Sequence, residues 1–301
     1  RTHVEGLGSM IIVRLIGGLG NQMFQYAAGR AVAERHRVPL LLDVSGFRDY
    51  PLRRFELHAF AIRAAIADET QLAAFTRPSS QAGLWAGLRR RLIGALSPSV
   101  LREASFTYDQ RIESVRPPVF LDGYWQSEKY FSHLAPLLGS EFSLQDGLNE
   151  PNVDMARQIS AAGGRAVSLH IRRGDYVSNA HTAQYHGVCS LDYYRAAVEL
   201  LSSRVAEPHF FVFSDDHAWV QENLEIPFPT TLVQVNSADH GMFDMALMKS
   251  CAHHIIANSS FSWWGAWLNP RPDKIVVAPR QWFRDAAHDT RDLIPDAWTR
   301  L

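Results

Sequence analysis

The strongest constraint on the fold of this chain is the regular alternation of short apolar runs and helical stretches in its second half. The expected strands are 166–172, 209–214, 231–235, 254–257 and 274–278, and the expected helices are 191–203, 217–224, 241–251 and 261–268. Neighbouring parallel strands need a long crossover connection, usually a helix, so this alternation predicts a parallel sheet. We therefore expect a doubly wound α/β domain that binds its ligand at the carboxyl ends of the strands.

The first half of the chain repeats the pattern in fewer copies. Strand 10–16 leads through the turn Gly17-Gly18-Leu19-Gly20 into helix 23–36 and strand 40–44, and a later strand 119–124 precedes helix 127–138. At roughly 100–200 residues per domain, 301 residues suffice for two domains. The linker Ala161-Ala162-Gly163-Gly164 divides them into 10–160 and 161–301. Residues 1–9 precede Met10 and are interpreted as an expression remnant outside the fold.

Charge and cysteine usage exclude several classes of function. Lys and Arg total 30 against 31 Asp and Glu, which argues against a nucleic-acid binder. Two cysteines exclude a disulfide framework and favour a cytoplasmic protein. No apolar run reaches the roughly 18 residues of a membrane span. Segment 83–96, with a leucine at every fourth position and three arginines, is expected to be an insertion helix on the first domain. The alternative is a helix on the membrane surface, so membrane contact is at most peripheral.

The run His170-Ile171-Arg172-Arg173-Gly174-Asp175-Tyr176 ends the strand 166–172. Because strand side chains alternate, His170 and Arg172 lie on one side of it, roughly 7 Å apart. An arginine at a strand's carboxyl end is a natural phosphate ligand. The alternative is a surface arginine paired with Asp175 beside a histidine that is satisfied in the core. An adhesion motif at 173–175 is disfavoured, because it would end a buried strand.

Two further runs carry groups that can bind a nucleotide. Asn258, Ser259 and Ser260 lie where a strand ends and a helix begins, and such a helix N-terminus offers free N–H groups to an anion. The alternative is a helix cap alone, and the tryptophans that follow are expected in the core. Asp244 is the only charge in the apolar opening of helix 241–251. It either complements the helix dipole or accepts two N–H groups from a guanine edge.

Other patterns are weaker. The glycine turn, with Asp43 downstream, is similar to a dinucleotide fingerprint, but its spacing differs, which disfavours a nicotinamide oxidoreductase. The pair Asp215-Asp216 is typical either of metal binding or of a helix cap. No clear metal-ligand spacing is present, so no metal site is predicted.

Taken together, these runs resemble the α-1,2-fucosyltransferases of glycosyltransferase family 11. Four segments carry the resemblance in chain order: IIVRLIGGLGNQMFQYAAGRA, VFLDGYWQSEKYF, HIRRGDYV and FDMALMKSCAHHIIANSSFSWWGAWLN. The resemblance implies a GT-B fold, with two Rossmann-like domains and an active site in the cleft between them. It further implies inverting transfer of fucose from GDP-β-L-fucose to the 2-OH of a terminal β-galactoside, without metal or other cofactor. The acceptor would be lactose or an O-antigen intermediate.

The resemblance also implies roles for individual residues. Arg172 would hold the donor β-phosphate, and His170 and Asp244 would face the guanine. The remaining donor contacts would come from Asn258, Ser259, Ser260, Phe261, Gly18 and Gly20. Asn21 would act at the reaction centre, and Asn21 and Gln22 would face the acceptor.

Three questions stay open from the sequence. A general base is not identified: Asp175, His181, His186 and Asp192 are candidates by position only, and a dissociative route needs none. The enzyme could form another fucosyl linkage or use another GDP-sugar. From a different class, the chain could be a non-catalytic GDP-binding module. A cytoplasmic location is expected, at most peripheral on the inner face of a bacterial membrane.

Overall fold

The computed structural model describes residues 9–48, 53–76, 98–174, 187–285 and 288–301. Its contacts divide the chain into two compact units. The first comprises Arg1–His58 with Ile62–Glu141, and the second comprises Ala59–Ala61 with Phe142–Leu301. The expected insertion helix at 83–96 lies outside the described residues.

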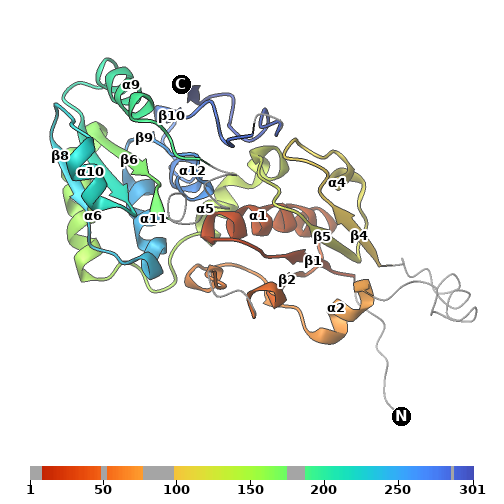
Figure 1. Cartoon of the computed structure of the whole chain (residues 1–301). Coiled ribbons are helices and arrows are strands. Elements are labelled where there is room, and N and C mark those ends of the chain that lie inside the picture. Colours follow the sequence, from red (N-terminus) through yellow and green to blue (C-terminus); the bar gives the residue numbers. More distant parts are fainter. Residues whose placement is uncertain (1–8, 49–52, 77–97, 175–186, 286–287) are drawn as a thin grey trace, which may run out of the picture. The chain divides into compact units, whose positions relative to one another are not determined.

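The first unit is a parallel sheet with a long buried helix packed on it. Its strands follow the order β3-β2-β1-β5-β4, and their bounds are β1 Ile11–Arg14, β2 Leu40–Asp43, β3 Ala65–Ile66, β4 Ser99–Arg102 and β5 Val119–Asp122. Its helices are α1 Leu19–His36, α2 Glu69–Thr76, α4 Arg111–Ser114 and α5 Ala135–Glu141. Ile11, Ile12 and Val13 in the central strand are fully buried, and α1 runs along the sheet beside them (Figure 1). The predicted strand–turn–helix–strand start of the chain is confirmed.

The second unit is a larger parallel sheet with helices on both faces. Its strands follow the order β11-β10-β9-β6-β7-β8, and their bounds are β6 Ala166–Ile171, β7 His209–Ser214, β8 Thr230–Val233, β9 His253–Ile255, β10 Val276–Ala278 and β11 Thr299–Arg300. Its helices are α6 Glu150–Ala162, α9 Leu191–Ser202, α10 His217–Asn223, α11 Gly241–Ser250 and α12 Ser260–Trp267. Every strand and helix predicted after residue 165 is present, with ends shifted by one or two residues.

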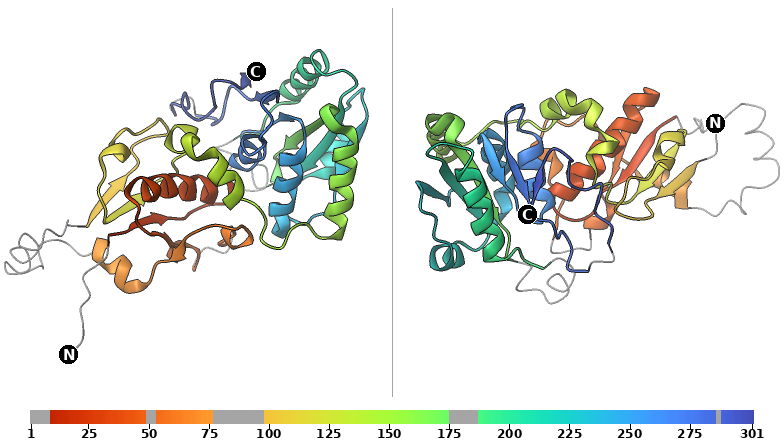
Figure 2. Two further views of the ribbon diagram at one scale, coloured as in Figure 1. Left: turned by 180° about the vertical axis from the view of Figure 1, so that it is seen from behind. Right: turned by 90° about the horizontal axis from the view of Figure 1, so that it is seen from above.

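Alternating side chains fix which helices cover which face of the second sheet. Val167, Leu169 and Ile171 of β6 pack with residues of α9 and α10. On β7, Phe210 and Val212 belong to that same cluster, whereas Phe211 and Phe213 pack with α6 and α11. The two clusters lie on opposite faces, as the period of two requires. Figure 2 shows these helices on both sides of the strands.

The boundary between the two units differs from the sequence prediction. The contacts divide the chain between Glu141 and Phe142 rather than at 160/161. Helix α6, which the sequence reading left unassigned, packs on the second sheet through Met155, Ile159 and Ala162. The glycines predicted as a linker therefore form only the tight turn Gly163–Arg165 between α6 and β6.

The stretch predicted as helix 127–138 is broken. It forms two 3-10 turns, Glu128–Tyr130 and Ser132–Leu134, before α5 begins. The break lies at Phe131, whose φ of −145° and ψ of 3° are not helical, and the buried ring of Phe131 packs 5.9 Å from that of Phe24 in α1. Tertiary packing therefore overrides the local helical preference here.

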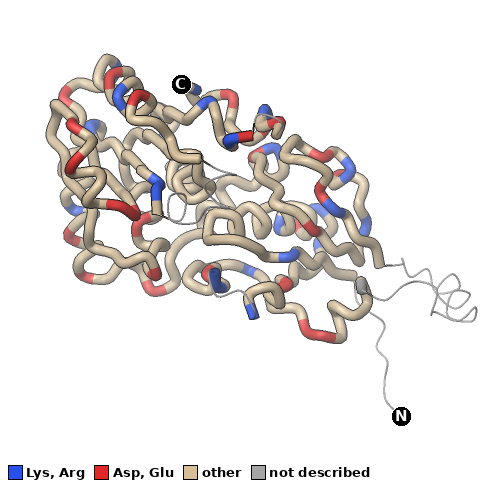
Figure 3. Tube along the Cα trace, viewed as in Figure 1, with Lys and Arg blue, Asp and Glu red and all other residues tan. Residues whose placement is uncertain are grey.

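The charge balance of the sequence is visible along the fold. Figure 3 shows basic and acidic residues interspersed through both units, in keeping with the totals of 30 and 31. In the described part of the chain, no helix is both long and apolar enough to cross a membrane.

Candidate functional site

The carboxyl end of β6 presents the two residues of the His-x-Arg run. His170 is the penultimate residue of β6, and Arg172 directly follows the strand. The Arg172 Nη1 atom lies 2.9 Å from Asp215 Oδ2, just beyond the end of the neighbouring strand β7, and the two side chains are 27% and 23% exposed. Arg172 thus pairs with Asp215, whereas its alternative partner Asp175 lies outside the described residues. The ion pair orients a half-buried guanidinium at the ligand-binding edge of the sheet.

The rest of this run supports that ion pair. Asp215 Oδ1 also accepts the backbone N–H of Arg173 at 2.8 Å. A Cβ atom on Gly174 would lie 2.7 Å from Asp215 Oδ2, so only glycine fits there without displacing the carboxylate. Arg173 itself lies over the Trp219 ring at 3.9 Å and pairs with Asp216 at 3.3 Å. The Arg173 side chain is therefore engaged in contacts within the fold, which agrees with the expectation that 173–175 is not an adhesion motif.

His170 is a buried, neutral histidine with an unused ring nitrogen. The residue is 5% exposed, and burial lowers the pKa of its imidazole to about 4. Its Nδ1 atom is buried and has no hydrogen-bond partner among the residues that the structure describes. The ring lies 5.6 Å from that of Phe261, and a Cβ atom on Gly241 would lie 3.3 Å from the same Phe261 ring. Phe261 therefore joins the end of β6 to the start of α11.

Asp244 lies in the first turn of α11. Burial raises the pKa of its carboxyl to about 6, although Asn236 Nδ2 donates a 2.7 Å hydrogen bond to Oδ1 and opposes that rise. Asn236 in turn exchanges two 2.8 Å hydrogen bonds with the buried Asn152 of α6. This amide pair holds Asp244 through a residue that the sequence reading did not single out, because its contacts come from α6.

The Asn-Ser-Ser run has a structural role in each of its first two residues. Asn258 is buried, and its Nδ2 atom donates to the carbonyls of Gly187 at 3.3 Å and Trp282 at 3.1 Å. Ser259 is the N-cap of α12, and its hydroxyl accepts the N–H of Phe261 at 3.3 Å. Ser260 begins α12 and is half-buried. The predicted cap is confirmed, and the tryptophans after it are in the core: Trp263 and Trp264 are fully buried.

In the first unit, the glycine turn presents Asn21 at the start of α1. Gly17 has a φ of +78°, and a Cβ atom there would lie 2.5 Å from Asn21 Nδ2. Gln126, which follows β5, donates from Nε2 to Asn21 Oδ1 at 2.8 Å. Gln126 Oε1, Trp125 Nε1 and Gln25 Nε2 are buried and have no hydrogen-bond partner in the described ranges. Several buried polar atoms near the carboxyl end of the first sheet therefore lack a hydrogen-bond partner in the described part of the chain.

The other residues of the turn hold its shape. Gln22 is fully buried and donates to the carbonyls of Gly17 at 3.0 Å and Arg54 at 2.8 Å. It also accepts the N–H of Glu56 at 2.9 Å. This side chain is fully committed to the protein, so the structure gives Gln22 a supporting role rather than the predicted contact with an acceptor. Gly18 is the N-cap of α1 and Gly20 is buried within α1.

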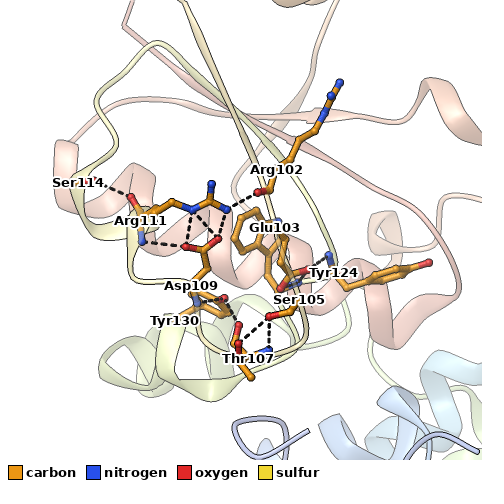
Figure 4. Close-up of polar contacts among 10 residues, drawn as sticks. Arg102, Glu103, Ser105, Thr107, Asp109, Arg111, Ser114, Tyr124 and Tyr130 are labelled. Atoms are coloured by element: carbon orange, nitrogen blue, oxygen red, sulfur yellow. Dashed lines mark hydrogen bonds and ion pairs between the residues drawn. The ribbon is translucent and has the colours of Figure 1, made fainter. Parts of the chain in front are cut away.

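Glu103 shapes the loop that carries Gln126. It follows β4 and accepts the N–H groups of Tyr124 at 2.7 Å and Trp125 at 3.0 Å (Figure 4). Burial raises the pKa of its carboxyl to about 7, and these two hydrogen bonds oppose that rise. A Cβ atom on Gly123 would lie 2.4 Å from Glu103 Cβ, so glycine is required beneath it. Glu103 could not be identified from the sequence pattern, because its partners Tyr124 and Trp125 lie in the loop after β5, 21 and 22 residues away.

Two aspartates, Asp216 and Asp43, form local backbone contacts. Asp216 caps α10 by accepting the N–H of Trp219 at 3.1 Å, which confirms the cap reading. Asp43, the acid after the glycine turn, accepts the N–H of Ser45 at 3.0 Å in a local turn. Within the described ranges, no group of three His, Cys, Asp or Glu side chains could hold a metal ion.

The general-base candidates are only partly described. Asp192 in α9 has a side chain 93% exposed and lies 3.5 Å from Arg195. Asp175, His181 and His186 lie outside the described residues. The identity of a base stays a prediction.

The geometry of Gly17 gives a direct test of the first-unit turn. We expect Gly17→Ala to lower the free energy of unfolding by about 1–2 kcal/mol, since a left-handed backbone is unfavourable for alanine. We expect it also to reduce turnover, because the new methyl group displaces the Asn21 amide. Gly139→Ala in α5 is the matched control, since a Cβ atom there meets nothing within 4 Å. Urea denaturation and initial rates measure both effects, and a Gly17→Ala protein with unchanged turnover would remove the turn from the site.

Two parallel α/β units with polar groups at the carboxyl ends of their strands define the GT-B class of nucleotide-sugar transferases. Comparison with known proteins gives the family. The model of glycosyl transferase family 11 matches residues 110–301. An Escherichia coli alpha-1,2-colitosyltransferase is 35% identical over 301 residues, covering 97% of this chain and 99% of that protein. The Escherichia coli O-antigen biosynthesis glycosyltransferase WbnK is 36% identical over 301 residues, covering 95% and 99%.

A solved structure supports the fold. A mutant of Arabidopsis thaliana FUT1 in complex with GDP aligns with a TM-score of 0.50 at 13% identity, covering 91% of this chain and 71% of that chain. The chain belongs to glycosyltransferase family 11. It is a glycosyltransferase with the GT-B fold, and it is related to α-1,2-fucosyl- and α-1,2-colitosyltransferases.

Proposed function

We propose that this enzyme is a galactoside α-1,2-L-fucosyltransferase that uses GDP-β-L-fucose. It transfers fucose to the 2-OH of a terminal β-galactose, with inversion at the anomeric carbon and without a metal ion. The acceptor we propose is an O-antigen intermediate in the cytoplasm, and lactose serves as its simple analogue. The relative WbnK, named for O-antigen biosynthesis, supports this class of acceptor.

The observation that carries the proposal is the group of residues around Phe261. The unpartnered Nδ1 of His170, the Phe261 ring and the first turn of α11 with Asp244 meet in the second unit. A planar base fits against an aromatic ring, and a carboxylate accepts the two N–H groups that guanine presents on one edge. A neutral imidazole nitrogen supplies a further hydrogen bond. Among nucleotide bases, this combination favours guanine.

Charge stabilisation is the second part of the proposed mechanism. Transfer leaves additional negative charge on the diphosphate of GDP as the bond from fucose C1 to oxygen breaks. Arg172, the N–H groups at the start of α12 and the Ser260 hydroxyl are the donors that we assign to that diphosphate. Because Asp215 holds Arg172 in place before substrate binds, little reorganisation is needed as charge develops.

The acceptor side of the reaction is assigned to the first unit. Asn21, whose Oδ1 accepts a hydrogen bond from Gln126, is half-buried and offers its amide at the carboxyl end of the sheet. Sugar hydroxyls can both donate and accept, so they match such mixed groups. We propose that Asn21 orients the reacting sugar and that Gln22 only supports it.

The proposal is tested by measuring GDP release from GDP-fucose with and without lactose, followed by NMR of the product linkage. Lactose-dependent GDP release and an α-1,2 linkage are expected. Release without any acceptor indicates a hydrolase, binding without release indicates a GDP-binding module, and a different linkage overturns the regiochemistry.

A second donor is favoured by one specific comparison. The relative named alpha-1,2-colitosyltransferase is 35% identical to this chain. Colitose is L-fucose without its 3-hydroxyl, so the two donors share GDP and differ at a single group. Parallel assays with GDP-fucose and GDP-colitose separate the two candidate donors. If kcat/KM for GDP-colitose is well above kcat/KM for GDP-fucose, colitose replaces fucose as the proposed sugar.

The raised pKa of Asp244 predicts a pH-dependent affinity for GDP. A carboxyl group with a pKa of about 6 is mostly protonated at pH 5 and mostly ionised at pH 7. Since only the ionised form accepts two N–H groups, we expect GDP affinity to rise up to about tenfold between these pH values. His170, with a pKa of about 4, stays neutral throughout.

Calorimetric titration with GDP at several pH values measures this effect. Asp244→Asn is the control, because it keeps the side-chain shape and exposes any titration of the GDP phosphates themselves. We expect weaker binding and a flatter pH profile for that variant. Equal profiles for the two proteins would remove Asp244 from the base pocket.

A further inference from the structure

A cavity of about 900 Å³ lies in the second unit, at the carboxyl ends of β9 and β10. Asn258 follows β9 on its floor, and Pro279 follows β10 on its wall. The other lining residues come from the segment 187–190, the start of α9 and the segment after β10. A volume near 900 Å³ suits an oligosaccharide of a few rings rather than a single ion.

Two arginines supply positive charge to the described part of the cavity lining. Arg280 and Arg284 line it, both are exposed, and neither forms an ion pair with any described residue. Among the described lining residues, the carboxylates are the side chain of Asp192, which is 93% exposed and lies 3.5 Å from Arg195, and the chain terminus at Leu301, whose backbone oxygen accepts the N–H of Arg280 at 2.7 Å. Guanidinium groups bind carboxylates and phosphates through two parallel hydrogen bonds. Arg280 and Arg284, which have no ion pair with a described residue, therefore give the wall two groups that can bind an anion.

The walls of the cavity are fixed by buried contacts. The Asn258 amide ties Gly187 to Trp282, and Cys189 Sγ donates to Asn258 Oδ1 at 3.4 Å. The hydroxyl of Tyr193 donates to the carbonyl of Ile256 at 2.6 Å. Trp282, beside Gln281 in the wall, is 3% exposed. A cavity held open in this way needs little ordering when a ligand binds.

The cavity adjoins the proposed donor site without sharing its charged groups. Asn258 directly precedes Ser259 and Ser260, whereas His170, Arg172 and Asp244 are absent from the lining. A ligand in the cavity can therefore be bound together with GDP-fucose. For a transferase, the second ligand is the acceptor; because its terminal galactose is assigned to Asn21, the cavity is a candidate for a more distant group of the same glycan.

We propose that this cavity binds an anionic group of the acceptor glycan, either the carboxylate of an acidic sugar or a phosphate at the reducing end, through Arg280 and Arg284. The proposal rests on the proposed transferase function. Gln281, also in the lining, supplies an amide for the neighbouring hydroxyl groups.

Calorimetry in the presence of GDP tests the site without requiring turnover. The probes are lactose, β-galactosyl-1,4-glucuronic acid and lactose 1-phosphate, which differ in charge and share the terminal galactose. We expect at least one anionic probe to bind about tenfold more tightly than lactose, and Arg280→Ala combined with Arg284→Ala to abolish that preference. Which anionic probe is preferred distinguishes a carboxylate from a phosphate. Arg204→Ala is the control, because Arg204 is an exposed arginine of the same unit that lies outside the lining.

Each outcome separates this proposal from the proposed function. Equal affinity for all three probes, or an unchanged preference in the double variant, overturns the anion site even if fucose transfer proceeds. Loss of GDP affinity in the double variant would assign the arginines to the donor instead. An anionic preference in a protein that releases no GDP from GDP-fucose would keep the site and overturn the proposed reaction.

Discussion

Replacing Arg172 by alanine is expected to lower kcat/KM for fucose transfer by about 10³-fold or more. In the proposed reaction, Arg172 faces the charge that develops on the leaving diphosphate, and removing even one preorganised donor from such a site costs about 10²–10³ in rate. A full positive charge at 27% side-chain exposure is expected to contribute at the upper end of that range. Initial rates with GDP-fucose and lactose measure the effect.

Three companion variants decide how the loss arises. Arg172→Lys keeps the charge without the planar fork, so partial activity is expected. Asp215→Ala leaves the guanidinium but removes its orientation at 2.9 Å, so a smaller loss is expected. Arg157→Ala, an exposed arginine of α6 in the same unit, is the matched control. Near-normal turnover of a folded Arg172→Ala protein would contradict the assignment.

The fold was largely predictable because local residue patterns indicate most of its strands and helices. Runs such as 209–214 are apolar, short and bounded by polar turns, and β7 has those same bounds. Elements that were not predicted lack such a pattern. Strand β4 is mostly exposed along its length, and helix α6 has Pro151 in its first turn, where a proline is also consistent with a loop. The end of the first unit at Glu141 was not predicted, because helix α6, which packs on the second sheet, had not been recognised from the sequence.

The candidate site was predictable in its positions and not in its partners. Arg172 follows β6, and Asp244 and Asn21 lie in the first turns of α11 and α1, as the local side-chain period and turn residues predict, whereas their roles in binding stay predictions. Their partners Asp215, Asn236 and Gln126 come from other elements, and Gln126 is 105 residues from Asn21. No spacing rule within one segment identifies such contacts. The same limit explains why Gln22 was predicted as an acceptor ligand, although Arg54 and Glu56 already bind its amide.

Glu141 gives the largest expected effect on stability. Its side chain is 3% exposed, and its carboxylate accepts hydrogen bonds from Tyr26 at 2.6 Å and from Arg30 at 3.1 Å, both in α1. Removing one partner of a buried ion pair typically costs 3–5 kcal/mol, and here the exposed Glu34 would be the remaining described acidic partner of the Arg30 guanidinium. We therefore expect Glu141→Ala to lower the free energy of unfolding by about 3–5 kcal/mol, measured by urea denaturation.

Arg30 pairs with both Glu141 and Glu34, and two further variants test whether the effect belongs to the buried Glu141. Glu34 pairs with the same arginine at 2.7 Å, yet its side chain is 52% exposed. Solvent screens such a pair, so Glu34→Ala should change stability by no more than about 0.5 kcal/mol. Glu141→Gln keeps a hydrogen-bond acceptor for Tyr26 and should fall between the two. If Glu141→Ala and Glu34→Ala proved equally mild, the carboxylate would not be what anchors α1 to α5. The packing of the fully buried Phe131, in the segment before α5, against Phe24 would then be what holds this part of the chain on α1.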